Sequence, residues 1–176
     1  MDEQLENARR ALVEGQRRSK QGSYERRSPS QEALPFLRRA RAELTSYLDQ
    51  HPACEEAWRM LSMAEECLLH YSDARWCFER GLKLGSKPDR KDLRRIALLK
   101  EYERKWLALG LTAAQLQLLG TFLEEELRRT SCDHSQKATR KWLEVIGVDR
   151  ADELLKAMSD YGGHCDCEIL ANVVAG

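Results

Sequence analysis

The stretch Ala57–Pro88, AWRMLSMAEECLLHYSDARWCFERGLKLGSKP, decides the fold of this chain. Trp58 and Leu61 stand in its first half, and Ala74 and Gly81 stand in its second half. A bulky side chain packs between two antiparallel helices only where a small residue faces it. This order of large and small positions therefore predicts a helical hairpin, and we expect an all-α protein.

The same positions recur one repeat length earlier. Ala40 stands one repeat length, about 34 residues, before Ala74. Pro52 stands the same interval before Ser86, and Pro88 lies close to Ser86. The pattern resembles the tetratricopeptide repeat family. This resemblance implies one well-formed repeat, a degenerate repeat before it, and antiparallel helical hairpins that display a surface to partners.

The resemblance also implies which residues face a partner. In tetratricopeptide proteins, the first helix of each hairpin lines the concave surface, and a protein or peptide partner binds there. A solvated charged face is the simpler interpretation of Arg59 taken alone. Matching the motif to this chain predicts four partner-binding residues: Glu56, Arg59, Met63 and Glu66.

The charge balance of the chain argues against a polyanionic partner. The 176 residues include 29 Lys or Arg and 29 Asp or Glu, so no overall positive field attracts nucleic acid. The first residues, MDEQLENARR, are polar, and we expect neither a membrane span nor an export signal. We therefore expect a soluble, cytoplasmic protein. Its six cysteines then serve as buried thiols or metal ligands, with Cys67 and Cys77 as core residues.

Helical periodicity extends over both sides of the central hairpin. We predict an amino-terminal helix with a narrow apolar face, an exposed loop over Gly22–Ser30 and a second helix from Pro35 to about Gln50. The predicted inward residues are listed by helix: Leu5, Ala8 and Leu12; Leu37, Ala40, Leu44, Tyr47 and Leu48; and, after Pro88, Leu93, Ile96, Leu99 and Trp106.

A second domain is predicted to begin after Gly110. Glycine suits the left-handed turn that ends a helix, and Thr112 with Gln115 forms a capping box at the start of the next helix. The sequence therefore divides into a repeat region, 1–110, and a helical module, 111–176. Two short helices follow in that module, with Trp142, Leu143 and Ile146 facing Leu154, Leu155 and Met158. The terminal CEILANVVAG is predicted as either a helical turn or a short strand.

Cysteine and histidine residues flank these two short helices. Cys132-Asp133-His134 precedes the first helix, and Cys165-Asp166-Cys167 follows the second. Two antiparallel helices of similar length return the chain to its starting end, so the two motifs should meet. Three thiols and one imidazole are the ligands of a structural zinc site. We predict zinc as the cofactor and four ligands: Cys132, His134, Cys165 and Cys167.

Several alternatives remain open for this cluster. The cysteines could be inert core residues, or they could form a thiol redox sensor. His164 is a spare ligand candidate, and Asp133 or Asp166 could orient a histidine. The chain contains no nucleophile elbow and no Gly-rich phosphate loop.

The two motifs resemble a second family. A bacterial domain of unknown function carries CDH near a helix start and a terminal GG-aromatic-CDCE, which here are Cys132–His134 and Gly162–Glu168. The resemblance covers about Leu111 to Val174 and departs at His164, where an aromatic residue such as Tyr is expected. The resemblance implies that the two motifs are parts of one site, and it implies no particular reaction.

The combined interpretation is an interaction scaffold or adaptor of the tetratricopeptide type with a zinc-stapled carboxy-terminal module. The alternative is a metal-dependent enzyme, in which one of the four ligand positions stays open for water, or the thiol redox sensor. A closed four-ligand shell would exclude the enzyme, whereas a three-ligand site would favour it.

Overall fold

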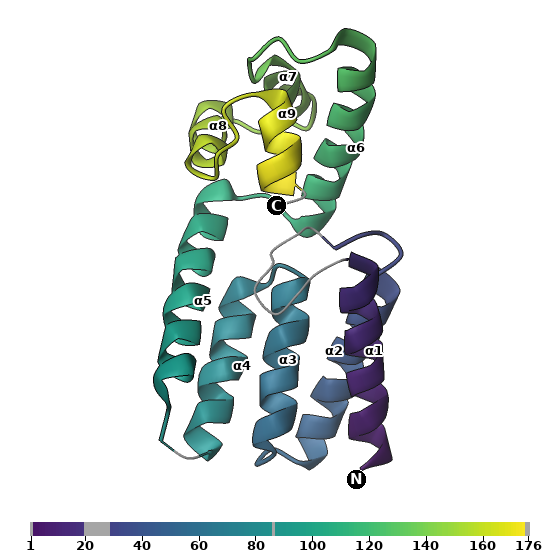
Figure 1. Ribbon diagram of the computed structural model, residues 1–176, viewed down its shortest axis with the longest axis vertical. Helices are drawn as coiled ribbons and strands as arrows, with labels where there is room; N and C mark the ends of the chain where they lie inside the picture. The colour runs from purple at the N-terminus through teal and green to yellow at the C-terminus, as the bar shows by residue number, and fades with distance from the viewer. Residues whose placement is uncertain (1, 20–28, 86, 175–176) are drawn as a thin grey trace. The chain divides into compact units, whose positions relative to one another are not determined.

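The computed structural model describes residues 2–19, 29–85 and 87–174, and these residues form an all-α fold (Figure 1). No strand occurs in these ranges. Of the carboxy-terminal segment predicted as a helical turn or a short strand, the described residues 167–174 are helical. In chain order the elements are α1 (Glu3–Ser19), α2 (Leu34–Gln50), α3 (Glu55–Cys67), α4 (Tyr71–Leu84), α5 (Arg90–Leu109), α6 (Ala113–Thr130), α7 (Lys137–Val145), α8 (Ala151–Asp160), α9 (Asp166–Glu168) and the π-helical η1 (Ile169–Val174).

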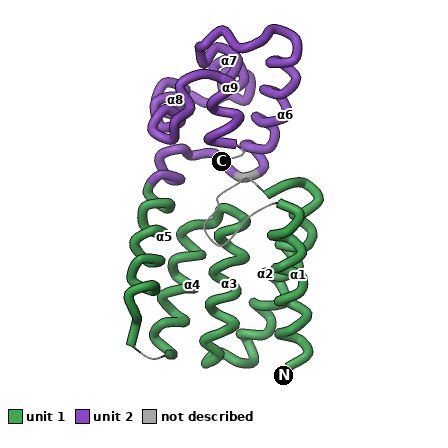
Figure 2. The backbone as a smooth tube through the Cα atoms, viewed as in Figure 1, with its two compact units in different colours: residues 1–25, 29–104 green, residues 26–28, 105–176 purple. Residues whose placement is uncertain are grey.

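The chain divides into two compact units, which are described separately (Figure 2). Unit 1 contains the described residues up to Arg104, and unit 2 contains those from Lys105 onward. The division falls within α5. Among the described helices, no single one is long and apolar enough to cross a bilayer; α5 and α6 pass that length and composition test only when taken together as a bent pair.

Unit 1 consists of two hairpins and a closing helix. Helix α1 packs on α2, α3 packs on α4, and α3 also contacts α2 and α1. The small positions of the central hairpin lie where the sequence predicts them. Ala74 is fully buried, and its carbonyl accepts a hydrogen bond of 2.7 Å from the Ser62 hydroxyl. A Cβ atom at Gly81 would lie 3.2 Å from the Cβ of Trp58, so this close helix contact requires a small residue.

Helix α5 covers the open side of α4. Ile96 and Leu99 pack against the cluster formed by Ala74, Phe78 and Leu82. The prediction that Leu93 points inward is wrong, because its side chain is 58% exposed. At 3.6 residues per turn, Leu93 lies about 120° around the helix from Leu99. The neighbouring flank of α5, which carries Asp92 and Arg95, instead contacts α3 through ion pairs.

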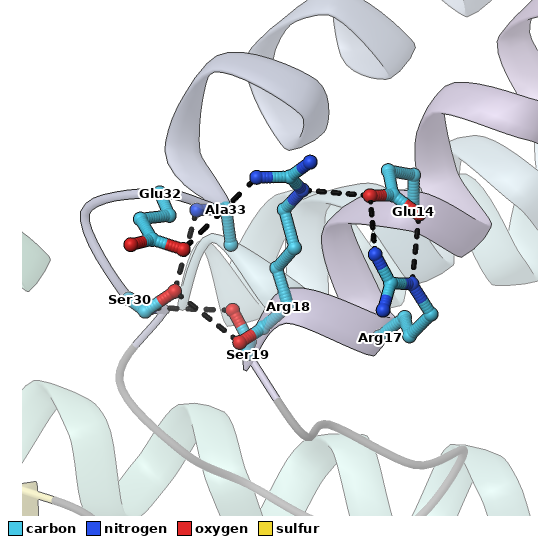
Figure 3. Close-up of polar contacts among 7 residues, drawn as sticks. All are labelled: Glu14, Arg17, Arg18, Ser19, Ser30, Glu32 and Ala33. Carbon is cyan, nitrogen blue, oxygen red and sulfur yellow. Dashed lines mark hydrogen bonds and ion pairs between the residues drawn. The ribbon is translucent and has the colours of Figure 1, made fainter.

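The predicted loop Gly22–Ser30 lies almost entirely outside the described residues, but the described residues Ser19, before it, and Ser30, at its end, contact each other (Figure 3). The backbone amide of Ser30 donates to the Ser19 hydroxyl over 3.2 Å, and the Ser30 hydroxyl accepts from the amide of Ala33 over 3.3 Å. Arg17 and Arg18 both donate to Glu14 and lower the pKa of that carboxyl to about 2. These arginines are therefore engaged within the chain.

The division between the units lies at Arg104 and Lys105, within α5, but helix α6 begins with the predicted turn and cap. Gly110 has φ of +62°, and the Thr112 hydroxyl accepts from the amide of Gln115 while the Gln115 side chain accepts from the amide of Thr112. The predicted core is largely confirmed, but Ile146 is 37% exposed because α7 ends one residue before it. The side chains of the two short helices that are buried as predicted are Trp142, Leu143, Leu154, Leu155 and Met158. In α6, Leu116, Leu119 and Leu123 are buried as well.

Candidate metal centre

The two cysteine motifs of unit 2 meet in space. The chain turns at Ser131 and His134, which both have φ of +60°, before entering α7, and it returns through α8 to the start of α9. The ligand atoms of Cys132, His134 and Cys165 all lie within 4.8 Å of one another. The Sγ atom of Cys167 lies 3.2 Å from that of Cys165. Three of the four residues predicted as metal ligands, Cys132, His134 and Cys165, thus form one mutually close set, and the fourth, Cys167, lies beside Cys165.

The cluster is buried on one side and open on the other. Cys165 is buried and Cys132 is half-buried, whereas His134 and Cys167 are exposed. The backbone amides of Cys167 and His134 donate to the Cys132 sulfur and lower the pKa of that thiol. Hydrogen bonds to Cys165 and Cys132 raise the pKa of the Cys167 thiol. A bound cation would displace the protons of these thiols, because a metal takes thiolate ligands.

The two aspartates, named as alternatives that could orient a histidine, bind other groups in the structure. Asp133 accepts from the amide and hydroxyl of Ser135 and from Lys137. These contacts stay within residues 133–137 and lower the pKa of the Asp133 carboxyl to about 2. Asp166 contacts the first turn of α7 instead. His164, the spare ligand candidate, is exposed, and its backbone amide donates to Glu168.

Gln136 is a site residue that sequence reasoning missed. Its side-chain amide donates to the carbonyl of Gly163 over 2.6 Å and to the Ser159 hydroxyl over 3.1 Å. Gln136 follows His134 by two residues, and Gly163 precedes Cys165 by two residues. The contact therefore ties the segments that carry the two ligand pairs. A single glutamine in the sequence carries no signal for such a contact.

The other cysteines are not part of this centre. Cys67 and Cys77 are buried in the core of unit 1, as predicted. Burial raises the pKa of Cys67 to about 11 and that of Cys77 to about 12, so both are protonated at neutral pH. They serve as packing residues.

Unit 1 contains a second group of mutually close ligand types, Glu65, His70 and Asp73. Glu65 already accepts from Arg41 over 2.6 Å and contacts His70 Nδ1 at 2.7 Å. Burial raises the pKa of Glu65, but the hydrogen bonds from His70 and Arg41 outweigh this and leave its pKa below the ordinary value. This group is an ion-pair network rather than an open ligand set.

The four predicted partner-binding residues lie on α3, and three of them form ion pairs within unit 1. Glu56 pairs with Arg9 of α1, and Glu66 pairs with Arg95 of α5. Arg59 donates to Asp92 of α5 over 2.8 Å and to Glu55 over 2.7 Å. Met63 is partly buried. A cavity of about 260 Å³ lies beside them, with Arg59, Ser62, Met63, Phe78, Lys91 and Arg95 in its lining.

Comparison with known proteins supports the second resemblance. Residues 119–172 match the family model described as "Protein of unknown function (DUF2695)", and this range contains both cysteine motifs. Uncharacterized proteins of Mycobacterium tuberculosis and Mycobacterium bovis are each 32% identical to the chain over 59 residues. The match covers 34% of this chain and 59% of each relative. No tetratricopeptide family model matches, and no solved structure matches significantly.

Proposed function

We propose that this chain is a protein-interaction adaptor whose carboxy-terminal module is stabilised by a structural zinc ion. The observation that carries the proposal is the convergence of Cys132, His134, Cys165 and Cys167 from two segments about thirty residues apart in the sequence. Such a cluster requires the whole of α7 and α8 to be folded between the two segments. A metal bound there would stabilise that fold.

Zinc suits this ligand set better than other common cations. Thiolate and imidazole ligands select zinc, whereas magnesium and calcium take oxygen ligands. Three thiolates and one imidazole also complete a tetrahedral shell, which is the usual arrangement of a structural zinc site.

The position of Cys167 argues against the metal-dependent enzyme. A catalytic zinc ion has three protein ligands and leaves a fourth position for water. Cys167 lies outside the mutually close set of three ligands, but its Sγ atom is only 3.2 Å from that of Cys165, so Cys167 is the nearby residue that would fill the fourth position. The same distance is compatible with a thiol redox sensor, so metal content is the measurement that separates these functions.

The adaptor role rests on unit 1. Its hairpins follow the order expected of tetratricopeptide repeats, in which α1 and α3 are the first helices of consecutive hairpins and α5 takes the next equivalent place. Ion pairs connect α1 to α3 and α3 to α5. The cavity beside Arg59 and Met63 supplies a concave surface for a peptide or helix of a protein partner.

Elemental analysis of untagged, full-length protein tests the zinc site. We expect one zinc ion per chain in wild type, and little or none in the Cys132→Ser and Cys167→Ser variants, because each loses a thiolate ligand. Cys77→Ser is a matched control that should retain zinc, since Cys77 lies in the core of unit 1. Metal-free wild type, purified under reducing conditions without chelators, would contradict the proposal and direct attention to the thiol chemistry of Cys165 and Cys167.

Affinity capture tests the adaptor role. A Met63→Glu variant places a charge in the lining of the cavity, and we expect it to retain less than about a tenth of the partner captured by wild type, as for a central interface residue. Val13→Glu makes the same chemical change at a side chain that is 57% exposed on α1, and it should capture the partner normally. Equal capture by both variants would exclude this surface, provided that circular dichroism shows both to be folded.

A further inference from the structure

Asp166 lies between two of the proposed zinc ligands and contacts the segment that carries the other two. Its side chain is 5% exposed. One carboxylate oxygen accepts from the amide of Thr139 over 2.9 Å and from the Thr139 hydroxyl over 2.6 Å. The other oxygen accepts from the amide of Ala138 over 2.9 Å. Asp166 therefore binds the first turn of α7, immediately after Cys132 and His134.

The backbone of Asp166 makes a fourth contact in the opposite direction. Its amide donates to the carbonyl of Ser135 over 2.8 Å. Ser135 follows His134 directly, and Asp166 follows Cys165 directly. A single residue thus fixes the position of one ligand pair relative to the other, and none of these four contacts involves a metal ion.

The contacts are favourable because the N-cap residue of α7 leaves the amides of Ala138 and Thr139 without a local acceptor. This N-cap residue, Gln136, makes no side-chain capping bond. The first amides of a helix need acceptors, and a negative charge is stabilised near a helix amino terminus. Asp166 supplies both from a distant part of the chain. Its burial is compatible with its charge because every oxygen is hydrogen-bonded.

We propose that Asp166 is the positioning residue of the metal centre and that it holds the two ligand pairs together before the metal binds. The inference rests on the proposed zinc site. Its consequence is that zinc enters a preformed site, so part of the affinity depends on a residue that never touches the ion. Residues that orient metal ligands typically contribute roughly 10- to 100-fold in metal affinity.

The test compares two aspartates, one in each ligand motif. Zinc affinity is measured on the full-length protein by competition with a chromophoric chelator, and cobalt absorption reports the geometry of the site. We expect Asp166→Ala to weaken zinc affinity roughly 10- to 100-fold. Asp133→Ala should weaken the affinity much less, because the contacts of the Asp133 side chain, with Ser135 and Lys137, stay within residues 133–137 and do not join the two ligand pairs.

Two further variants keep the inference testable if Asp166→Ala does not fold. Thr139→Val removes only the hydroxyl donor and should weaken zinc affinity by a smaller factor, whereas Asp166→Asn retains an acceptor and should restore part of the lost affinity. Wild-type affinity in Asp166→Ala, or in Thr139→Val if the former is unfolded, would overturn the positioning role while leaving the zinc site intact. Absence of zinc binding in wild type would overturn both.

Discussion

The Cys132→Ser substitution is expected to lower the melting temperature of unit 2 by roughly 12–24 °C. In isolated zinc fingers the metal supplies ~10–16 kcal/mol of apparent folding free energy. Unit 2 is also stabilised by an apolar core and by the hydrogen bonds of Asp166 and Gln136. We therefore expect the substitution to lower its free energy of unfolding by less than in a zinc finger, about 3 kcal/mol. For a domain of this size, each 1 kcal/mol lowers the melting temperature by roughly 4–8 °C.

Calorimetry together with hydrogen exchange of peptide fragments measures this effect. Exchange should accelerate in α7, α8 and α9 of the variant and remain unchanged in α1–α4, because the proposed metal ligands all lie in unit 2. Zinc chelation of wild type should reproduce the result. Cys54→Ser is the matched control, since Cys54 is the N-cap residue of α3, where serine is a favourable cap. Equal melting of Cys132→Ser and wild type would show that no metal stabilises the module.

The second large effect is expected for Leu37→Ala in unit 1. Leu37 is fully buried, and its Cδ2 atom lies 2.6 Å from the position that a Cβ atom on Gly15 would occupy. The side chain therefore packs directly against the backbone of α1. That backbone has little freedom to collapse into the space left by truncation, so we expect a loss of about 2–5 kcal/mol in the free energy of unfolding.

Urea denaturation followed by circular dichroism measures this loss as a shift of the transition midpoint. Leu93→Ala removes the same atoms from a side chain that is 58% exposed, and it should cost much less. A similar, small shift for both leucines would mean that α1 does not pack on α2 as described, because a buried contact of this kind must lose more than an exposed one.

The helical architecture was predictable because it depends on local patterns. Apolar spacing located α2, α3 and α4, and the capping box of Thr112 and Gln115 located the start of α6. The errors arose where neighbouring elements decide the orientation of a side chain. Leu93 satisfies the apolar pattern of α5, but the flank of α5 that carries Asp92 and Arg95 faces α3 through ion pairs. This orientation leaves the Leu93 side chain exposed.

The ligand cluster was predictable for a similar reason. Two helices of comparable length, each ending in a turn, return the chain to its starting point, and this geometry follows from helix rise and turn residues alone. The role of Asp166 was not predictable. A carboxylate beside two cysteines suggests a partner for a ligand, whereas the structure pairs it with the backbone of α7.

The sequence by itself thus determined the helices, their apolar faces and the meeting of two cysteine motifs, because each depends on periodicity and chain length. Only the tertiary structure decided which polar side chains connect these elements. Hydrogen bonds such as those of Asp166 with Ala138 and Thr139, or of Gln136 with Gly163, join residues that are more than twenty positions apart. Their partners are backbone groups, which every residue carries alike, so no residue type in the sequence distinguishes them.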